Sequence, residues 1–296
     1  MKIVIAGGSG FLGKALQQYF EAQQHTVLIL SRTAHKSNHI AWDGKNQGNW
    51  SAAIEGTDVL INLTGKSVDC RYTAANKQAI LASRIDSTKA LQEAVNRASH
   101  QPALWINASS ATIYIHAETR QMDEYNGTIG DDFSMNVCKQ WEATFFEEKL
   151  PGLRKVALRT SIVLGNEGGA YPKLKALTKA YMGGSQGDGR QMMSWIHIHD
   201  FCRAVAHIIR DQEIDGAVNV TAPYPISNKD FMQAMRHKYR RSFGLSQNRL
   251  LLELGAIFLR TEAELLLKSR NVFPEKLSLQ GFSFDYPKLE LALQNL

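Results

Sequence analysis

Apolar residues form two short, uninterrupted runs near the start of the chain, with a helical pattern between them. The first run, Lys2–Ala6, has no polar alternation, which is typical of a strand buried on both faces of a sheet. The second run spans residues 26–30. Between them, apolar side chains recur at helical spacing, namely Phe11, Leu12, Ala15, Leu16, Tyr19 and Phe20. The pattern predicts a strand–helix–strand unit.

Strand and helix patterns then alternate over most of the chain. Further buried strands are predicted at 58–63, 103–108, 155–159 and 217–220. Helices are predicted around 85–95, at 134–148 and after Asp200, which we expect to be the N-cap. This order predicts an α/β fold with a Rossmann-type, doubly wound and mostly parallel sheet. After Pro223 and Pro225 the pattern becomes mainly helical, with a leucine-rich stretch at 250–267.

The turn after the first strand is rich in glycine. Gly7, Gly10 and Gly13 lie between the first strand and the first helix. Such a turn lets backbone N–H groups approach a pyrophosphate, and the helix N-terminus adds a favourable dipole. A glycine-rich turn alone is a weak signal, but here both flanking elements are predicted. The sequence therefore predicts a dinucleotide site formed by Gly7, Ser9, Gly10, Phe11, Leu12 and Gly13.

The end of the second strand indicates which dinucleotide is preferred. NAD-binding units usually place a carboxylate there for the adenosine ribose. This chain has Ser31 and Arg32 instead, and its next acidic residue is Asp43. A guanidinium suits a 2′-phosphate, which a carboxylate would repel. We therefore expect NADP(H) to be preferred over NAD(H), although a solvated basic loop is the plainer interpretation.

Small and polar residues also follow the other predicted strands. Asn62, Leu63, Thr64 and Gly65 end one strand, Ser109 and Ser110 end the next, and 160–165 follow another. In open α/β sheets, ligands bind beyond the carboxyl ends of the strands. We therefore expect a cofactor to lie across this edge of the sheet and to be bound by Asn62, Leu63, Thr64 and Gly65.

Composition narrows the possible functions. The chain has 296 residues, 44% of them hydrophobic, which is enough for one large or two moderate domains. Its 34 Lys and Arg residues give a net charge of +6 but are scattered, so no nucleic-acid interface is expected. The three cysteines show no metal-ligand spacing. No apolar stretch reaches membrane-spanning length, and a signal peptide is not evident, so we expect a cytoplasmic protein that does not contact the membrane.

These motifs together resemble those of the extended short-chain dehydrogenase/reductases, the nucleotide-sugar epimerase group. The glycine turn, residues 62–65 and residues 109–114 carry this resemblance. A narrower resemblance, to atypical sugar-nucleotide epimerase-like proteins, covers essentially the whole chain through residues 83–85, 141–142, 187–191, 194–200, 216–223 and 273–284. It implies an NAD(P)-binding domain at 1–225, with 166–199 on the substrate side, and a small, mainly helical C-terminal substrate domain at 226–296.

The resemblance also implies catalytic residues. The parent family uses a serine, which steadies a developing oxyanion, and a Tyr-x-x-x-Lys pair on a helix. Ser110 matches the serine, and Lys139 matches the lysine that holds the nicotinamide ribose. Met135 stands where the tyrosine is expected, and a thioether cannot donate or accept the proton. Tyr114 is the alternative acid/base, although aromatic packing is favoured for it. Cys138 is expected in the core.

Four further residues are candidates for binding. Trp195 and His197 are expected to line the substrate side. His197 and His199 lack a third ligand, so no metal site is predicted. Arg84 is expected at the cofactor site or against a substrate phosphate, and Arg159 is expected against a substrate phosphate. For both arginines an ordinary surface ion pair is the alternative.

Three functions remain open at this point. The first is an NADP(H)-dependent epimerase or oxidoreductase acting on a small polar substrate such as a nucleotide sugar, which the intact glycine turn, Ser110 and Lys139 favour. The second is an NADP(H)-binding sensor or regulatory protein without efficient turnover, which Met135 favours. The third is an interaction protein whose leucine-rich C-terminal stretch forms a homodimer.

Overall fold

Residues 1–248 and 267–296 are described in a computed structural model of the chain. The leucine-rich stretch at 250–267 lies outside the described residues, except for its last position.

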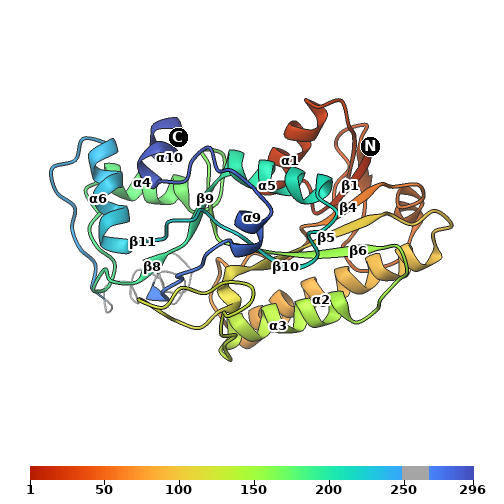
Figure 1. The fold of residues 1–296 in the computed structure, drawn as a ribbon, viewed down its shortest axis with the longest axis horizontal. Coiled ribbons are helices and arrows are strands. Elements are labelled where there is room, and N and C mark those ends of the chain that lie inside the picture. Colours follow the sequence, from red (N-terminus) through yellow and green to blue (C-terminus); the bar gives the residue numbers. More distant parts are fainter. Residues whose placement is uncertain (249–266) are drawn as a thin grey trace.

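A parallel sheet forms the centre of the molecule (Figure 1). In the described part of the chain it has seven strands in the order β10-β6-β5-β4-β1-β2-β3, and all neighbouring strands are parallel. The strands are β1 Lys2–Ala6, β2 Thr26–Ser31, β3 His39–Ala41, β4 Val59–Asn62, β5 Leu104–Ser110, β6 Arg154–Thr160 and β10 Gly216–Val220. The predicted α/β fold is confirmed. Among the seven strands of this sheet, β3 is the one that the sequence pattern does not predict, because its single large apolar residue, Ile40, does not make an apolar run.

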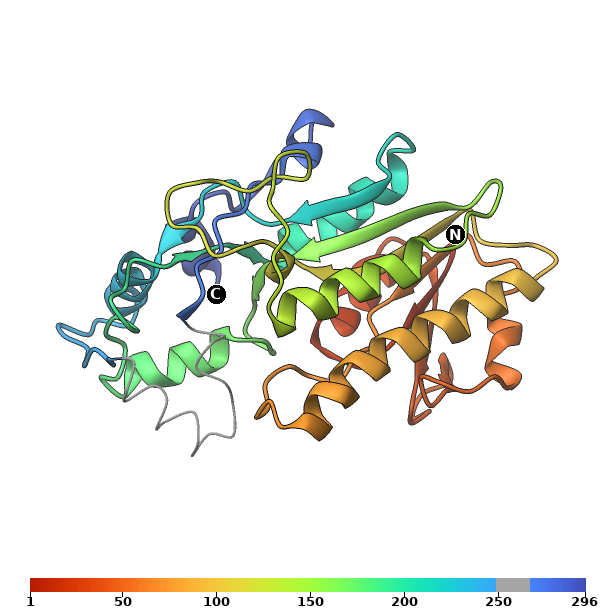
Figure 2. The same cartoon turned by 90° about the horizontal axis from the view of Figure 1, so that it is seen from below.

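Helices cover both faces of this sheet (Figure 2). α1 Phe11–Glu21 and α5 Ile198–Arg210 pack on one face, whereas α2 Ala74–Arg97 and α3 Phe133–Phe146 pack on the other. Alternation along β1 explains this two-sided burial. Ile3 and Ile5 join the core beneath α1 and α5, whereas Val4 joins the core beneath α2 and α3. Two short 3-10 helices, η1 Asn49–Ala53 and η2 Ala111–Ile113, lie in the connections.

The other elements gather at one end of the molecule, on the left in Figure 1. β7 Ile162–Leu164 pairs with β9 Trp195–His197 in parallel, and β8 Met192–Met193 pairs with β11 Ile226–Ser227 in antiparallel fashion. The helices here are α4 Tyr171–Lys179, α6 Asn228–Lys238 and α10 Leu289–Asn295, and α9 Glu275–Leu279 packs on β10. Residues 166–199, which are predicted to lie on the substrate side, thus pack with C-terminal helices. The domain boundary at 225/226 stays a prediction.

The start of α5 corrects the expectation for Asp200. The N-cap is His197, whose Nδ1 accepts the backbone N–H of His199 at 3.1 Å. Asp200 is the third residue of the helix, in its first turn, and is fully buried. Its carboxylate accepts the backbone N–H groups of Asp285 (3.0 Å) and Tyr286 (2.8 Å). The sequence pattern predicts that this carboxylate caps its own helix. In the structure it instead accepts hydrogen bonds from the C-terminal tail.

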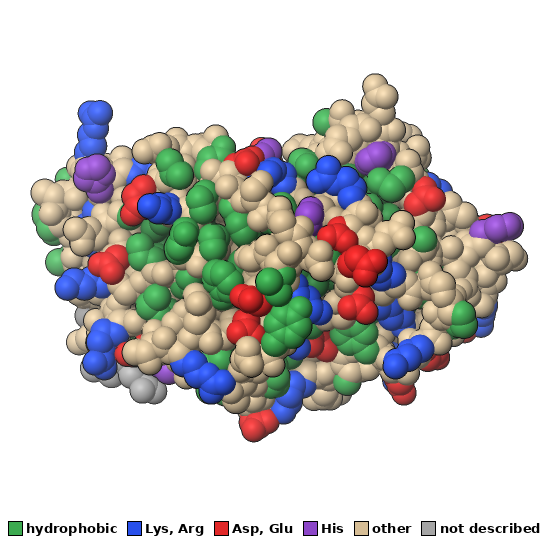
Figure 3. Space-filling model, viewed as in Figure 1, with side chains coloured by type: hydrophobic (Ala, Val, Ile, Leu, Met, Phe, Trp, Pro, Cys, Tyr) green, Lys and Arg blue, Asp and Glu red, His purple; other side chains and the backbone are tan. Residues whose placement is uncertain are grey.

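Charges are interspersed over the face seen in Figure 3, where acidic and basic side chains alternate across the surface. Hydrophobic side chains gather to the left of centre in that view. None of the described helices is long and apolar enough to cross a bilayer.

The turn between β1 and α1 depends on a close backbone contact, which yields a stability prediction. A Cβ at Gly13 would lie 2.3 Å from Cα of Gly8, whereas a Cβ at Gly10 would meet only the carbonyl oxygen of Gly7, at 3.8 Å. Gly13→Ala should lower the free energy of unfolding by about 1–3 kcal/mol or more, because backbone cannot move aside easily. Gly10→Ala is the matched control and should change it little. Urea denaturation measures both, and equal stabilities would contradict the contact.

Candidate functional site

The glycine turn leaves the start of α1 open to a ligand. Gly7 has a φ of +73°, and a Cβ there would lie 2.9 Å from the backbone nitrogen of Thr64. Gly10 is the N-cap of α1 and supplies no side-chain hydrogen bond. The first backbone N–H groups of the helix therefore keep their donors and their dipole for an anion. Ser9 and Gly10 are both exposed, and a Cβ at Gly10 would meet only the carbonyl oxygen of Gly7, at 3.8 Å, so this end of the helix is accessible to an anion.

The other predicted residues of this turn have different surroundings. Ser9 is exposed beside Gly10, and Leu12 packs against the core beneath α1. Phe11 is partly buried, and its ring packs beside Gly165 and Gly168, where a Cβ on either glycine would come within 2.7 Å of it. Phe11 and Leu12 therefore offer a ligand their backbone rather than their side chains.

The end of β2 carries an unpaired cation. Ser31 is buried, and its Oγ donates to the carbonyl oxygen of Thr33 at 2.7 Å. Arg32 is exposed and pairs with none of the described residues. The next acidic residue, Asp43, accepts the backbone N–H groups of Asn46 and Lys45, and these hydrogen bonds hold the pKa of its carboxyl below the usual value. No carboxylate therefore neutralises Arg32 within the described chain.

The end of β4 is fixed by a buried amide. The Asn62 side chain donates to Oδ1 of Asn107 at 2.7 Å and accepts the backbone N–H of Thr64 at 3.0 Å. This arrangement turns residues 63–65 across the sheet edge. The Oγ1 of Thr64 is buried without a hydrogen-bond partner. Buried hydroxyls are normally paired, so this atom is available to a ligand.

A cavity of about 340 Å³ opens beyond the carboxyl ends of β4 and β5, between α2 and α3. Its lining combines apolar side chains, hydroxyls and two cations. The lining residues are Leu63, Thr64, Gly65, Lys66, Ser67, Val68, Tyr72, Ile80, Arg84, Ala108, Ser109, Ser110, Thr112, Phe133, Ser134, Val137, Cys138 and Trp141. The structure thus brings together the predicted residues Leu63, Thr64, Gly65, Arg84 and Ser110.

Ser110 lies at the end of β5 with its hydroxyl at the cavity. Its Oγ accepts the backbone N–H of Thr112 at 3.2 Å, which caps η2 and leaves the hydroxyl hydrogen for another acceptor. The neighbouring Ser109 is used differently, because its Oγ donates to Oε1 of Glu142 at 2.6 Å.

The register of α3 corrects the match to the Tyr-x-x-x-Lys pair. Lys139 does not line the cavity, and its Nζ lies 2.6 Å from Oδ1 of Asp131 in an ion pair. Met135 is buried, and its sulfur packs beside Gly130. The α3 residues that do line the cavity with Ser110 include two pairs at four-residue spacing, Phe133 with Val137 and Ser134 with Cys138. The face of a helix changes with each residue, so a shift of one position replaces the expected pair.

Tyr114 does not reach the cavity either. It is fully buried, and its hydroxyl donates to Oδ1 of Asn219 at 2.9 Å and accepts from Arg159 at 2.8 Å. Burial raises the pKa of Tyr114. Arg159 also pairs with Glu142 at 2.8 Å, with each side chain 11% exposed. The structure therefore supports aromatic packing for Tyr114 and an internal ion pair for Arg159, rather than acid/base or phosphate-binding roles.

The two residues expected on the substrate side are core residues. Trp195 is fully buried, in the cluster that contains Phe231 and Leu289. His197 is 2% exposed and its ring lies 4.1 Å from that of Tyr286. Burial lowers the pKa of His197 to about 4, so its ring is neutral. Neither lines the cavity. No group of three metal-ligating side chains occurs among the residues that the structure describes.

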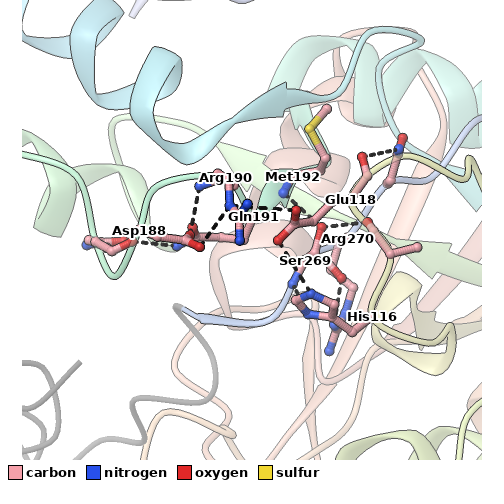
Figure 4. A network of polar contacts seen from close by, with 11 residues as sticks. His116, Glu118, Asp188, Arg190, Gln191, Met192, Ser269 and Arg270 are labelled. Carbon is pink, nitrogen blue, oxygen red and sulfur yellow. Dashed lines mark hydrogen bonds and ion pairs between the residues drawn. The ribbon is translucent and has the colours of Figure 1, made fainter. Parts of the chain in front are cut away.

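The motif at 187–191 and the C-terminal tail form a polar network (Figure 4). Nε of Arg190 lies 2.9 Å from Asp188 and 3.9 Å from Glu118. Ser269 donates its backbone N–H to His116 at 3.0 Å, and its Oγ accepts the backbone N–H of Met192 at 2.8 Å. These contacts hold Ser269, at the start of the described tail, against the loops that carry His116 and Met192.

Sequence reasoning missed several cavity residues. Tyr72, Lys66, Ser134 and Trp141 line it, yet none is part of a motif with a known chemical role. Tyr72 precedes α2 in a loop, and the chain gives no signal of where that loop lies. The one available signal was helical spacing on α3, where Ser134, Cys138 and Trp141 share a face.

The cysteines provide a test of the site's chemistry. Burial raises the pKa of the Cys138 and Cys202 thiols to about 12, although Cys138 lines the cavity. At pH 8 such a thiol is ionised to only about one part in ten thousand, and the thiolate is the reactive form. Iodoacetamide at pH 8 should therefore modify the partly exposed Cys70 first, as read by peptide mass spectrometry. Equally fast modification of Cys138 would contradict its assignment as an unreactive thiol.

Comparison with known proteins agrees with this architecture. Epimerase family protein SSP1921 of Staphylococcus saprophyticus is 34% identical, over 99% of this chain and 98% of that protein. Epimerase family protein YfhF of Bacillus subtilis is 33% identical, over 100% of this chain and 98% of that protein. The crystal structure of human epimerase family protein SDR39U1 with NADPH superposes with a TM-score of 0.90 at 29% identity, covering 100% of this chain and 98% of that one.

Family models match both parts of the chain. A domain of unknown function, DUF1731, matches residues 249–296. The model described as the NAD dependent epimerase/dehydratase family matches residues 3–221. With the Rossmann-type sheet and the open glycine turn already established, the chain belongs to the NAD dependent epimerase/dehydratase family.

Proposed function

We propose that this protein binds NADP(H) along the carboxyl edge of the sheet and acts as an oxidoreductase or epimerase on a small polar substrate. The observation that carries the proposal is the N-terminus of α1, which no side chain caps and which begins at the exposed Gly10. The unpaired Arg32 supports the choice of NADP(H), because it offers a cation for a 2′-phosphate. The similarity to a human relative crystallised with NADPH supports the same choice.

The cofactor and the substrate would bind in two adjoining parts of the site. Gly7, Gly10 and the N-terminus of α1 would bind the pyrophosphate, and Arg32 the adenosine phosphate. The nicotinamide, when bound, supplies or accepts a hydride. The cavity beside Ser110 would then receive the substrate. The buried, unpartnered Oγ1 of Thr64 fits a ligand at the border of both places.

The proton transfer needs a group other than the expected tyrosine of α3. Tyr72 lines the same cavity as Ser110 and carries the phenol that this chemistry requires. Its ring packs edge-on against Phe133, with centroids 5.0 Å apart, which fixes its orientation. We assign the acid/base role to Tyr72 and the stabilisation of a developing oxyanion to the Ser110 hydroxyl.

A sensor without efficient turnover is the second candidate. Ser134 and Cys138 on the cavity face of α3 favour it, because neither provides the phenol or the ammonium group of the parent family. A protonated thiol and a hydroxyl at this face are compatible with cofactor binding alone. The enzyme and the sensor would both bind NADP(H), but only the enzyme would convert a substrate at an appreciable rate. A homodimer and a cytoplasmic location remain expectations from the sequence.

Cofactor choice should depend on Arg32. The native protein should bind NADPH several-fold more tightly than NADH, and Arg32→Glu should reverse this order, because a carboxylate repels the 2′-phosphate. Nicotinamide fluorescence measures both dissociation constants. Lys288→Glu, an equal charge change at an exposed residue before α10, is the control and should keep the native order. Equal affinities in the native protein would overturn the NADP(H) assignment, and binding of neither would overturn the proposed function.

Turnover should depend on Tyr72. Cofactor absorbance across a panel of nucleotide sugars and small polar carbonyl compounds should reveal a substrate for the native protein. Tyr72→Phe should then lower kcat by about 10²-fold or more, the usual contribution of a general acid or base, without changing the NADPH dissociation constant. Tyr125→Phe, at an exposed tyrosine outside the cavity, is the control. Native activity that survives in Tyr72→Phe would refute the assignment, and silence of the native protein favours the sensor.

A further inference from the structure

A second cavity, of about 190 Å³, lies on the face of the sheet that α1 and α5 cover (Figure 1). We call it the α5 cavity, and it is bordered by α1, α5 and a short stretch of the C-terminal tail. Its lining residues are Tyr19, Arg203, His207, Arg210, Gly281, Phe282 and Ser283. The cavity beside Ser110 lies between α2 and α3, which cover the opposite face. The sheet therefore separates the two cavities, and each would hold a ligand of its own.

The lining of the α5 cavity has two guanidinium groups and two hydroxyl groups. Arg203, His207 and Arg210 follow one another at helical spacing, so they share one face of α5. α1 adds Tyr19 and the tail adds Ser283. Neither hydroxyl forms a hydrogen bond with a residue that the structure describes. No Asp or Glu of the described chain lines the α5 cavity, so its donors face no resident carboxylate.

Arg203 is fixed by ion pairs that leave part of its guanidinium free. Its Nη1 lies 2.8 Å from Oδ1 of Asp200 and 2.9 Å from Oδ1 of Asp285, and it donates to the carbonyl oxygen of Ser283 at 2.9 Å. Its Cζ also lies 5.4 Å from the ring centre of Phe282. Nε and Nη2 form no hydrogen bond within the described ranges. The two carboxylates balance the charge of Arg203, which therefore serves as a prepositioned donor.

Arg210 supplies the charge that no acid balances. It is exposed in the last turn of α5 and forms no ion pair or hydrogen bond with a described residue. His207 lies between the two arginines. Its Nε2 lies 3.1 Å from the carbonyl oxygen of Gln280 and 4.0 Å from Oδ2 of Asp211, and its ring centre lies 5.4 Å from that of Phe282. These contacts fix the floor of the α5 cavity and leave the guanidinium of Arg210 available to a ligand.

We propose that the α5 cavity binds a phosphate group, either as inorganic phosphate or as part of a phosphorylated small molecule. A carboxylate presents two oxygens in one plane, which a single guanidinium can satisfy, whereas a phosphate directs its oxygens apart and suits donors from several sides. The α5 cavity offers donors from three elements, namely α1, α5 and the tail. A bound phosphate would therefore connect the tail to the two helices. This inference goes beyond the proposed function and does not depend on it.

Protection of Arg210 from phenylglyoxal, an arginine reagent, tests the inference. NADPH is present at saturation to fill the cofactor site, and modification is followed by peptide mass spectrometry. At a free phosphate concentration about ten times the dissociation constant, modification of Arg210 should slow by about tenfold. Sodium chloride at the same ionic strength should leave the rate unchanged. Arg97, an exposed arginine of α2, is the control in the same sample and should react equally fast with and without phosphate.

Two further anions identify the source of the phosphate group. If the ligand is a phosphorylated molecule, methyl phosphate should protect Arg210 at least as well as inorganic phosphate does. If the ligand is the free ion, methyl phosphate should protect less well. Acetate should protect weakly in either case, because its two oxygens cannot reach donors on all three elements.

A charge introduced at Ser283 provides a second test that leaves both arginines in place. Ser283→Asp puts a carboxylate into the α5 cavity and should abolish protection by phosphate, because like charges repel. Ser283→Asn, of similar shape but uncharged, is the matched control and should retain protection. Ser283 is exposed, so both variants should fold, as circular dichroism verifies.

Four outcomes would overturn the phosphate site. Phosphate could leave Arg210 of the native protein fully reactive, or it could protect Arg97 as much as Arg210. Acetate could protect Arg210 as well as phosphate does. Finally, folded Ser283→Asp could be protected like the native protein. Each result would show that the α5 cavity does not select a phosphate group.

Discussion

The buried ion pair between Arg159 and Glu142 fixes the geometry of the whole site. Arg159 lies on β6 and Glu142 on α3, and both side chains are 11% exposed. Ser109 of β5 and Tyr114 join the same network through hydrogen bonds. Breaking such a pair leaves an unpaired internal charge, a change that costs about 3–5 kcal/mol. The network therefore holds α3 in one rotation about its axis, and this rotation determines which side chains reach the cavity.

Much of the fold could be predicted from the sequence because it depends on short-range pattern. The apolar runs of β1, β2, β4, β5, β6 and β10 are buried on both faces, and a run without alternation shows this directly. The glycine turn could be predicted for the same reason, since its strand and its helix are local. The capping of α5 could not, because the partners of Asp200 lie at residues 285 and 286 of the tail.

The site was predictable only in part, and the failures have a common physical cause. Ser110 and Thr64 follow strand ends, so the parallel sheet brings them to one edge. Spacing along the chain points to Lys139 and Tyr114, but spacing does not determine which face of an element meets the cavity. One residue along a helix changes direction by roughly a quarter-turn or more. The long-range contact between Arg159 and Glu142 sets that direction, and no local pattern records it.

The charges and hydroxyls of the cavity suggest how a member of this family can work without the expected pair. On α3 the cavity face offers Ser134 and Cys138, and the raised pKa of Cys138 keeps its thiol neutral. A phenol and a cation nevertheless line the cavity, as Tyr72, whose ring packs against Phe133 at the start of α3, and Arg84 of α2. An arginine differs from a lysine in one decisive respect, since its guanidinium does not release a proton near neutral pH. Arg84 therefore stays a fixed cation, held by the carbonyl oxygens of Ile80 and Lys66, and the proton transfer that we propose for this cavity is left to Tyr72.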